Sequence, residues 1–333
     1  MTSALAAALA LYLAGSARGA ATVVLPPSDA WVTIPSQELT ARYDVVWAVS
    51  DVHGHLQELS QLLRAAGLAA PGAGGQLTWA PRLDRQLLIV VGDSIDGGPD
   101  SVGVVLTLRA LQAQAAAAGS RVILLLGNHE AGFLYKPRSA TVELVSSAAR
   151  AGIQLRRKHA GEQLAEGEFG DALREEPLLA VVGLWLFAHS GWIDAADDDG
   201  ALRDYFAQLA SAWSRGGRER YAPLHDALSI LESHNWWRAR RRRSLLKAHL
   251  SRLGLQVLAF GHDPDALGAM GTLAVDEGGS LVKLDTGLKT GASRGMLLRC
   301  EVVNGPGLAI RSGGRSTCRA MAPDGALHDL PVR

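Results

Sequence analysis

Cysteine is scarce in this sequence of 333 residues, with only Cys300 and Cys318, both near the C-terminus. No two cysteines are separated by two residues, and no cysteine–histidine finger spacing occurs, which excludes the common structural zinc sites. Two interpretations of the pair stay open. The cysteines are either separate buried thiols or a single disulfide formed in an oxidising compartment.

An excess of charge of either sign is also missing. The chain has 33 Lys and Arg residues and 33 Asp and Glu residues, so its formal net charge at pH 7 is +0. No global field draws it to nucleic acid or to an acidic membrane surface, and we expect no nucleic-acid partner. A hydrophobic fraction of 48% with 20% charged residues is typical of a globular protein.

Apolar runs long enough to span a bilayer are absent, so we expect no stable membrane insertion. Residues 1–23 carry a shorter apolar run at 5–14, followed by small residues and without charge before Arg18. This pattern predicts a signal peptide, and hence a periplasmic or secreted protein, although no basic residue precedes the run. The alternative is an Ala-rich N-terminal helix on a cytoplasmic protein.

Five predicted strands each end on polar side chains. The strands lie in the segments 44–50, 86–91, 121–126, 185–193 and 255–268, and helical patterns begin at about residues 56 and 101. The polar residues that follow them are, in chain order, Asp51, His53, Asp93, Asp96, Asn128, His129, His189 and His262. Ligands of open α/β sheets bind beyond the carboxyl ends of the strands, so we expect these side chains to converge on one site.

The segments between these strands differ in composition and suggest a domain plan. Residues 135–180 and 194–250 are predicted to be helical insertions that cover the site. They belong to a catalytic domain at 40–312, and residues 313–333 are predicted to form a C-terminal tail. Two later segments, 280–287 and 296–303, are also predicted strands.

Carboxylate, amide and imidazole groups make up this set, and no thiolate is included. Such ligands favour Mn²⁺, with Fe or Zn²⁺ as alternatives. The set exceeds the capacity of one ion, whereas two divalent ions about 3.5–4 Å apart and bridged by a carboxylate would use it. Two such ions lower the pKa of a shared water and clamp a phosphoryl group during displacement, which predicts a hydrolase of phosphate esters.

The motifs DVHG, GDSIDGG, GNHE, AHSG and GHDP, in that order, resemble those of the calcineurin-like metallophosphoesterase superfamily. Their spacing is similar to the bacterial and Shewanella-like branch of the phosphoprotein phosphatases. The resemblance covers about residues 44–300. It implies an α/β fold, a β-sandwich of mixed sheets flanked by helices, and a phosphorylated small molecule or protein as substrate.

The resemblance also implies roles for individual residues. Asp51 and His53 would bind a first metal ion, Asp93 would bridge two ions, and Asn128, His189 and His262 would bind the second. His129 would act as general acid toward the leaving-group oxygen. Asp96 would hold His129 in the required tautomer.

Phosphate binding is where the sequence departs from the family pattern. The arginine that usually follows the second aspartate is Gly97 here, which removes one phosphate-binding cation. The resemblance places Asn128 and Arg238 against the substrate phosphate, with Arg215 as the alternative to Arg238. Of the remaining histidines, His55 is expected to lie on the surface. The others are expected to be structural: His159, His225, His234, His249 and His328.

Three functions therefore compete. The leading hypothesis is a phosphomonoesterase with two divalent metal ions. A phosphodiesterase or dinucleoside-polyphosphate hydrolase is a second possibility within the enzyme class. In another class, a catalytically silent module would hold nucleic acid or polyphosphate on the arginine-rich segment 236–243. The sequence does not predict the oligomeric state.

Overall fold

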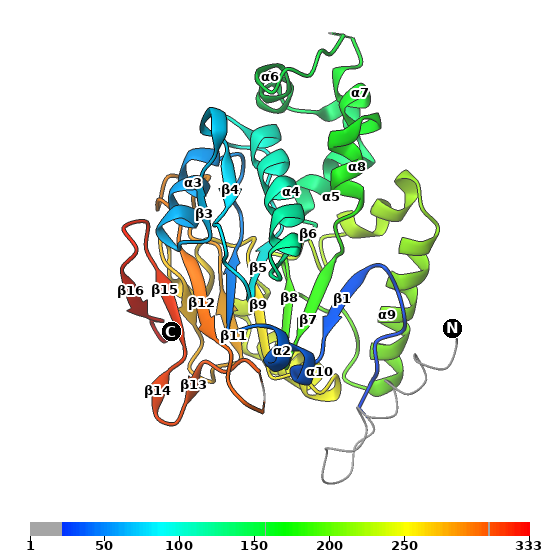
Figure 1. Cartoon of the computed structure of the whole chain (residues 1–333). Helices are drawn as coiled ribbons and strands as arrows, with labels where there is room; N and C mark the ends of the chain where they lie inside the picture. The colour runs from blue at the N-terminus through cyan, green and yellow to red at the C-terminus, as the bar shows by residue number, and fades with distance from the viewer. Residues whose placement is uncertain (1–21, 157, 306) are drawn as a thin grey trace, which may run out of the picture.

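Two six-stranded mixed sheets form the centre of the computed structural model, which describes residues 22–156, 158–305 and 307–333 (Figure 1). The first sheet has the order β1 (Trp31–Ile34), β7 (Leu179–Val182), β8 (Trp185–Ala188), β9 (Val257–Phe260), β11 (Leu281–Lys283) and β10 (Ala274–Val275). The second has the order β16 (Leu327–Asp329), β15 (Cys318–Met321), β12 (Leu297–Glu301), β2 (Val45–Val49), β5 (Gln86–Val91) and β6 (Arg121–Leu125).

The sheets pack face to face because successive side chains of each strand point to opposite sides. In β2, Val46 and Ala48 face a core shared with Phe187 and Ala259 of the first sheet. Trp47 and Val49 face the other way, toward helices. The strands β2, β5 and β6 run parallel, so their carboxyl ends meet at one edge. The expected fold, a β-sandwich of mixed sheets flanked by helices, is confirmed.

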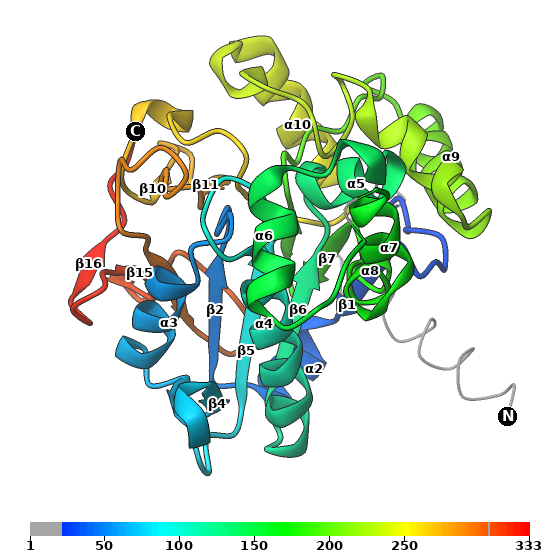
Figure 2. The ribbon, with the colours of Figure 1, turned by 90° about the horizontal axis from the view of Figure 1, so that it is seen from above.

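Helices cover both outer faces. Helices α3 (Leu56–Ala65) and α4 (Ser101–Ala117) pack on the second sheet. The first sheet shares its outer core with α5 (Asn128–Tyr135), α6 (Val142–Arg150), α7 (Ala160–Glu166), α8 (Glu168–Arg174), α9 (Asp199–Ser214) and α10 (Arg240–Arg252). Helices α6, α7 and α8 form a group at the top of Figure 1, nearest the viewer in Figure 2.

Short elements complete the fold. They are α2 (Ser36–Arg42), the hairpins of β3 (Ala69–Pro71) with β4 (Leu77–Trp79) and of β13 (Arg311–Ser312) with β14 (Arg315–Ser316), and several 3₁₀ turns. These turns are Ala73–Gly75, Pro137–Ser139, Arg218–His225, Trp236–Arg238 and Ala266–Gly268. None of the helices in the described ranges combines the length and the apolar character needed to cross a bilayer.

The expected domain limits differ from the structure at both ends. Strand β1 precedes residue 40 and pairs with β7, so the first sheet begins before the expected catalytic domain. Residues 313–333 are not a tail, because β15 pairs with β12 inside the second sheet and β16 extends it. Strands this short carry little periodic signal, and their partners lie far away in the chain. Of the expected signal peptide, 1–23, only residues 22 and 23 are described.

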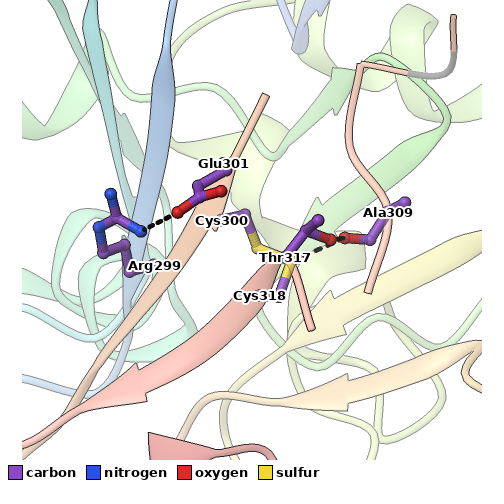
Figure 3. The surroundings of a disulfide bond; sticks show 6 residues. All are labelled: Arg299, Cys300, Glu301, Ala309, Thr317 and Cys318. Carbon is purple, nitrogen blue, oxygen red and sulfur yellow. Dashed lines mark hydrogen bonds and ion pairs between the residues drawn. A yellow bond between two sulfur atoms is a disulfide. The ribbon is translucent and has the colours of Figure 1, made fainter. Parts of the chain in front are cut away.

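The two cysteines form a disulfide that links β12 to β15 (Figure 3). Cys300 and Cys318 are paired across the antiparallel ladder, with their Cα atoms 4.0 Å apart. Both are buried in the core between the sheets. Of the two interpretations left open by the sequence, the structure therefore supports the disulfide.

Candidate metal centre

The predicted metal ligands meet at the edge where strands of both sheets end. Asp51 and His53 follow β2, Asp93 follows β5, and Asn128 begins α5 directly after β6. His189 and His262 reach the same place from β8 and β9. A cavity of about 230 Å³ opens here, lined by His53, Asp93, Asn128, His129, His234, His262, Pro264, Asp285, Gly287, Lys289 and Thr290.

Asp93 lies at the centre of the cluster. Its Oδ2 is 3.5 Å from His53 Nε2, and its Oδ1 is 3.4 Å from His189 Nε2. Asp51 Oδ1 lies 3.7 Å from His53 Nε2, and the Asp51 carboxylate accepts a hydrogen bond from the backbone N–H of His262. Two triads could each hold an ion, one of His53, Asp93 and His129 and the other of Asp93, His189 and His262.

The hydrogen bonds of the two buried histidines turn their lone pairs toward the cluster. His53 Nδ1 donates to the carbonyl of Asp96 at 2.8 Å, and His189 Nδ1 donates to the carbonyl of Val91 at 3.1 Å. With the proton on Nδ1, the Nε2 atom of each ring is free to bind a metal. Burial lowers the pKa of His53 to about 4, so this imidazole stays neutral at physiological pH.

Around His189, acceptor atoms face one another in an arrangement that calls for a cation. Asn128 donates through Nδ2 to Glu232, so its Oδ1 points to His189 Nε2 at 2.9 Å. His262 Nδ1 lies 3.1 Å from the same Nε2, and His262 Nε2 is buried without a partner among the described residues. Burial lowers the pKa of His262 to about 3. Acceptors this close repel one another unless a positive charge lies between them, which either a proton on His189 Nε2 or a metal ion can supply.

The pKa of His189 also indicates that the site favours a positive charge at this ring. Burial alone would lower it, but the charges of Asp93 and Asp51 and the hydrogen bonds raise it to about 10. The site therefore stabilises a positive charge at this point. The donor set, two carboxylates, one amide oxygen and three imidazoles, fits divalent ions such as Mn²⁺, Fe²⁺ or Zn²⁺.

Backbone geometry explains why glycine precedes the ligands in several motifs. A Cβ on Gly261 would lie 2.1 Å from Asp51 Oδ2, and one on Gly127 would lie 2.2 Å from Asp93 Oδ1. Only glycine lets these backbones approach the carboxylates so closely. Five residues of the site itself adopt positive φ angles: Asp51, His53, Asp93, Asp96 and His262. Strained backbone of this kind concentrates at functional sites.

Glu130, the last residue of the GNHE motif, holds the loops rather than a ligand. Its buried carboxylate accepts hydrogen bonds from the backbone N–H groups of Asp93, Ser94, Ile95 and Gly127, at 2.8–3.0 Å. It thereby joins the loop after β5 to the loop after β6. Together with the hydrogen bond from the backbone N–H of His129 to Asp93 Oδ1, this side chain positions Asp93 and Asn128 relative to each other.

His129 and Asp96 form the expected pair. His129 Nδ1 lies 3.1 Å from Asp96 Oδ2, and Thr141 donates to the other Asp96 oxygen at 2.7 Å. Burial alone would lower the pKa of His129, but the hydrogen bond to Asp96 and the charge of Asp93 raise it overall. Its Nε2 points into the cavity, 3.8 Å from Asp93 Oδ2.

Arg238 and Arg215 lie elsewhere. Arg238 pairs with Asp265, packs over the Trp237 ring, and lines a separate cavity of about 610 Å³ with Arg240. Arg215 lines a third cavity, of about 570 Å³, beside α9. Within the described ranges, neither side chain lines the cavity of the metal centre. Arg238 belongs to the 3₁₀ turn Trp236–Arg238 just before α10, so the expected contact of its side chain with a phosphate at the metal centre is not supported.

Several residues of the cavity were missed by the sequence interpretation. His234, expected to be structural, stacks on His262 with ring centroids 3.9 Å apart, and its Nδ1 lies 2.8 Å from Asp263. Asp285 is buried just after β11, and burial raises its pKa to about 6. Lys289 Nζ lies 2.9 Å from His129 Nε2. Asp285 lies within the predicted strand segment 280–287, near its carboxyl end, which is a signal that could have been used. His234 and Lys289 carry no such signal.

Comparison with known proteins agrees with this arrangement. A family model described as calcineurin-like phosphoesterase matches residues 45–266. The cold-active protein-tyrosine phosphatase of a psychrophilic Shewanella species has a TM-score of 0.65 and 18% identity, covering 95% of this chain and 87% of that one. A protein serine/threonine phosphatase from Saccharomyces cerevisiae has a TM-score of 0.57 and 16% identity, covering 88% and 84%. At these identities the likeness shows the fold.

A curated relative matches over a shorter segment. An uncharacterized protein of Schizosaccharomyces pombe is 36% identical over 86 residues, which are 26% of this chain. The match spans 25% of that protein's length.

Proposed function

Because the chain belongs to the calcineurin-like phosphoesterase family, we propose that it is a metal-dependent enzyme that hydrolyses phosphomonoesters. The observation that carries this proposal is the convergence of Asp51, His53, Asn128, His189 and His262 around the Asp93 carboxylate, at strand ends of both sheets. The substrate would be a phosphorylated small molecule or protein.

We assign the metal ligands in two groups that share Asp93. Asp51 and His53 would hold one divalent ion, and Asn128, His189 and His262 would hold the other; Mn²⁺ is our first candidate, and Fe or Zn²⁺ suits the same donors. When bound, the ions supply Lewis acidity and a water of lowered pKa. The tautomers of His53 and His189, set by the carbonyls of Asp96 and Val91, support this assignment.

His129 is proposed as the general acid. Asp96 accepts the Nδ1 proton and, together with Thr141, fixes the plane of the imidazole ring. The Nε2 atom then faces the cavity, where a proton on it can pass to the leaving-group oxygen of the ester. Such a proton donor contributes roughly 10²–10⁴ in rate.

The alternatives have less support. The arginines of 236–243 lie along a different cavity from the ligand cluster, so the silent binding module would leave that cluster without a role. A phosphodiesterase or a dinucleoside-polyphosphate hydrolase would use the same ligands. The cavity of about 230 Å³ at the ligands would take a phosphoryl group, and the cavity of about 260 Å³ that shares Asn128 and His129 with it would take the rest of a substrate.

Turnover by purified protein tests the proposal. With Mn²⁺, the protein should hydrolyse p-nitrophenyl phosphate faster than bis(p-nitrophenyl) phosphate, and Asn128→Ala and His129→Ala should each lower kcat at least about 100-fold. His328→Ala, an exposed histidine on β16, is the matched control and should behave as wild type. The assignment would be refuted if the wild-type protein showed no turnover after loading with Mn²⁺, Fe²⁺ or Zn²⁺. It would also be refuted if the protein showed no turnover but bound DNA with a steep dependence on salt concentration.

We also propose that the protein is exported to the periplasm or secreted. The signal-peptide pattern of residues 1–23 and the disulfide between Cys300 and Cys318 both support an oxidising compartment. Cell fractionation with an alkaline phosphatase fusion would test it, and activity of the fusion confined to the cytoplasm would count against export.

A further inference from the structure

Gly97 stands where the family pattern has an arginine, and the structure shows what fills that space. A Cβ on Gly97 would lie 2.9 Å from Lys289 Cγ and 3.2 Å from Lys289 Cε. The stem of Lys289 therefore runs over the bare glycine backbone. Gly97 has a φ of +103°, a region that L residues with side chains rarely adopt, so the position suits glycine alone. The absence of a side chain at position 97 leaves space for the side chain of Lys289.

The ammonium group of Lys289 lies at the solvent-exposed edge of the cavity of the metal centre. Its Nζ lies 2.9 Å from His129 Nε2, the atom proposed to protonate the leaving group. Lys289 is the one Lys or Arg among the described residues that line this cavity. No carboxylate in the described part of the chain lies within 4.0 Å of its Nζ, so its charge is not neutralised by an ion pair.

The loop that carries Lys289 is held in place by its own hydrogen bonds. The backbone N–H of Gly287 donates to Asp285 Oδ1 at 2.8 Å, and Thr290 Oγ1 donates to the carbonyl of Gly287 at 3.0 Å. Leu288 is buried and anchors the loop between them. The lysine thus extends from a fixed base at the end of β11 toward the site.

We propose that Lys289 is the phosphate-binding cation of this enzyme, in the place left by the absent arginine, and that it selects dianionic phosphomonoesters. The inference rests on the proposed function. The Nζ would donate to a non-bridging phosphate oxygen that enters between Lys289 and His129. That oxygen replaces the imidazole as the acceptor of the lysine N–H, so the freed lone pair of His129 Nε2 can take up a proton from solvent and pass it to the leaving-group oxygen.

The ammonium group of a lysine suits the binding of a doubly charged phosphate. An ammonium group is a point charge with rotatable donors, whereas guanidinium forms a planar fork. A monoester carries a second negative charge for the ammonium to bind, and a diester does not. Removal of the Lys289 side chain should therefore weaken the binding of monoesters more than the binding of diesters.

Three variants test the inference. Lys289→Gln removes the charge, Lys289→Arg keeps it, and Arg294→Gln removes a charge from the same loop at a residue that donates to Gln61, outside the cavity. In Mn²⁺-loaded protein, Lys289→Gln should raise KM for p-nitrophenyl phosphate about 10- to 100-fold, the range for losing one hydrogen bond to a charged group. The ratio of monoester to diester kcat/KM should fall, and Lys289→Arg should restore most of the loss. Arg294→Gln should match wild type.

Calorimetric titration with inorganic phosphate gives a readout that does not depend on turnover. Lys289→Gln should weaken phosphate binding by a similar factor. Unchanged KM and phosphate affinity in Lys289→Gln, or an equal loss in Arg294→Gln, would overturn the inference while leaving the phosphatase assignment intact. If wild-type protein hydrolyses no ester yet binds phosphate through Lys289, the proposed function fails and the anion site stands. Wild-type protein that neither binds phosphate nor turns over an ester overturns both.

Discussion

Glu130 carries one buried carboxylate that accepts hydrogen bonds from four backbone N–H groups on two separate loops. At the scale of single residues, this arrangement shows how a motif can contain a residue that never reaches the ligand. Asn128 and His129 face the cavity, whereas Glu130 points back into the protein and holds the loop of Asp93. The carboxylate is needed because all four partners are donors.

Replacing Glu130 with Gln should therefore destabilise the protein. The amide would turn N–H donors toward backbone N–H donors, and buried groups would lose their acceptor. We expect the free energy of unfolding in urea to fall by about 2–3 kcal/mol. Glu277→Gln, at an exposed position, serves as the control. A Glu130→Gln protein as stable as wild type would mean that the loops do not depend on this carboxylate.

At the scale of elements, strands with a clear apolar pattern were predicted correctly, short ones such as β8, β9 and β11 included, and the pair β15 and β16 was not. The strands β2, β5 and β6 and the helix α4 lie where their apolar patterns indicate. The strand pair β15 and β16 was taken for a tail. Its residues become strands because β12 offers a free edge, and the Cys300–Cys318 bond ties β15 to it. Pairing with a distant strand is not encoded in local periodicity.

The turn between β10 and β11 gives a prediction about pH. Asp276 accepts hydrogen bonds from Lys247 Nζ and from the backbone N–H groups of Ser280 and Leu281. Burial alone would raise the pKa of Asp276, but these bonds lower it below its usual range. A carboxyl group with a lowered folded-state pKa stabilises the protein above its unfolded-state pKa and loses that contribution as the pH falls.

Asp276→Asn should thus be less stable than wild type at pH 7, and the difference should shrink as the pH falls from about 5 toward 3. Urea unfolding of both proteins across this range measures it. Asp329→Asn, an exposed aspartate on β16, should show no such difference. If the difference in free energy of unfolding between Asp276→Asn and wild type stayed constant from about pH 5 to pH 3, the ionised carboxylate would be excluded as its cause.

At the scale of the whole molecule, the metal centre joins the two sheets. Asp51, Asp93 and Asn128 follow strands of the second sheet, and His189 and His262 follow strands of the first. Divalent ions held between these side chains would link both halves of the sandwich. A ligand that binds only the folded state stabilises it in proportion to the logarithm of its concentration above Kd.

Metal removal should therefore lower the thermal stability of the entire fold. Mn²⁺ at 100 times its Kd should add about 2.7 kcal/mol to the free energy of unfolding, and chelation should remove it. Asp93→Asn and His189→Ala should respond little to Mn²⁺, whereas His328→Ala should respond as wild type does. An equal rise in Tm for wild type and for both ligand variants would place the ions elsewhere.

The sequence by itself singled out the candidate metal ligands and the pair of His129 and Asp96, because these polar residues follow strong strand patterns in short glycine-containing motifs. Asp51, Asp93 and His129 needed no knowledge of distant contacts. Only the tertiary structure decided that Lys289 covers Gly97, that His234 stacks on His262, that Arg238 stays outside the cavity, and that residues 318–329 complete a sheet. These features depend on which loops meet in space, and contacts between segments far apart in the chain leave no local pattern to read.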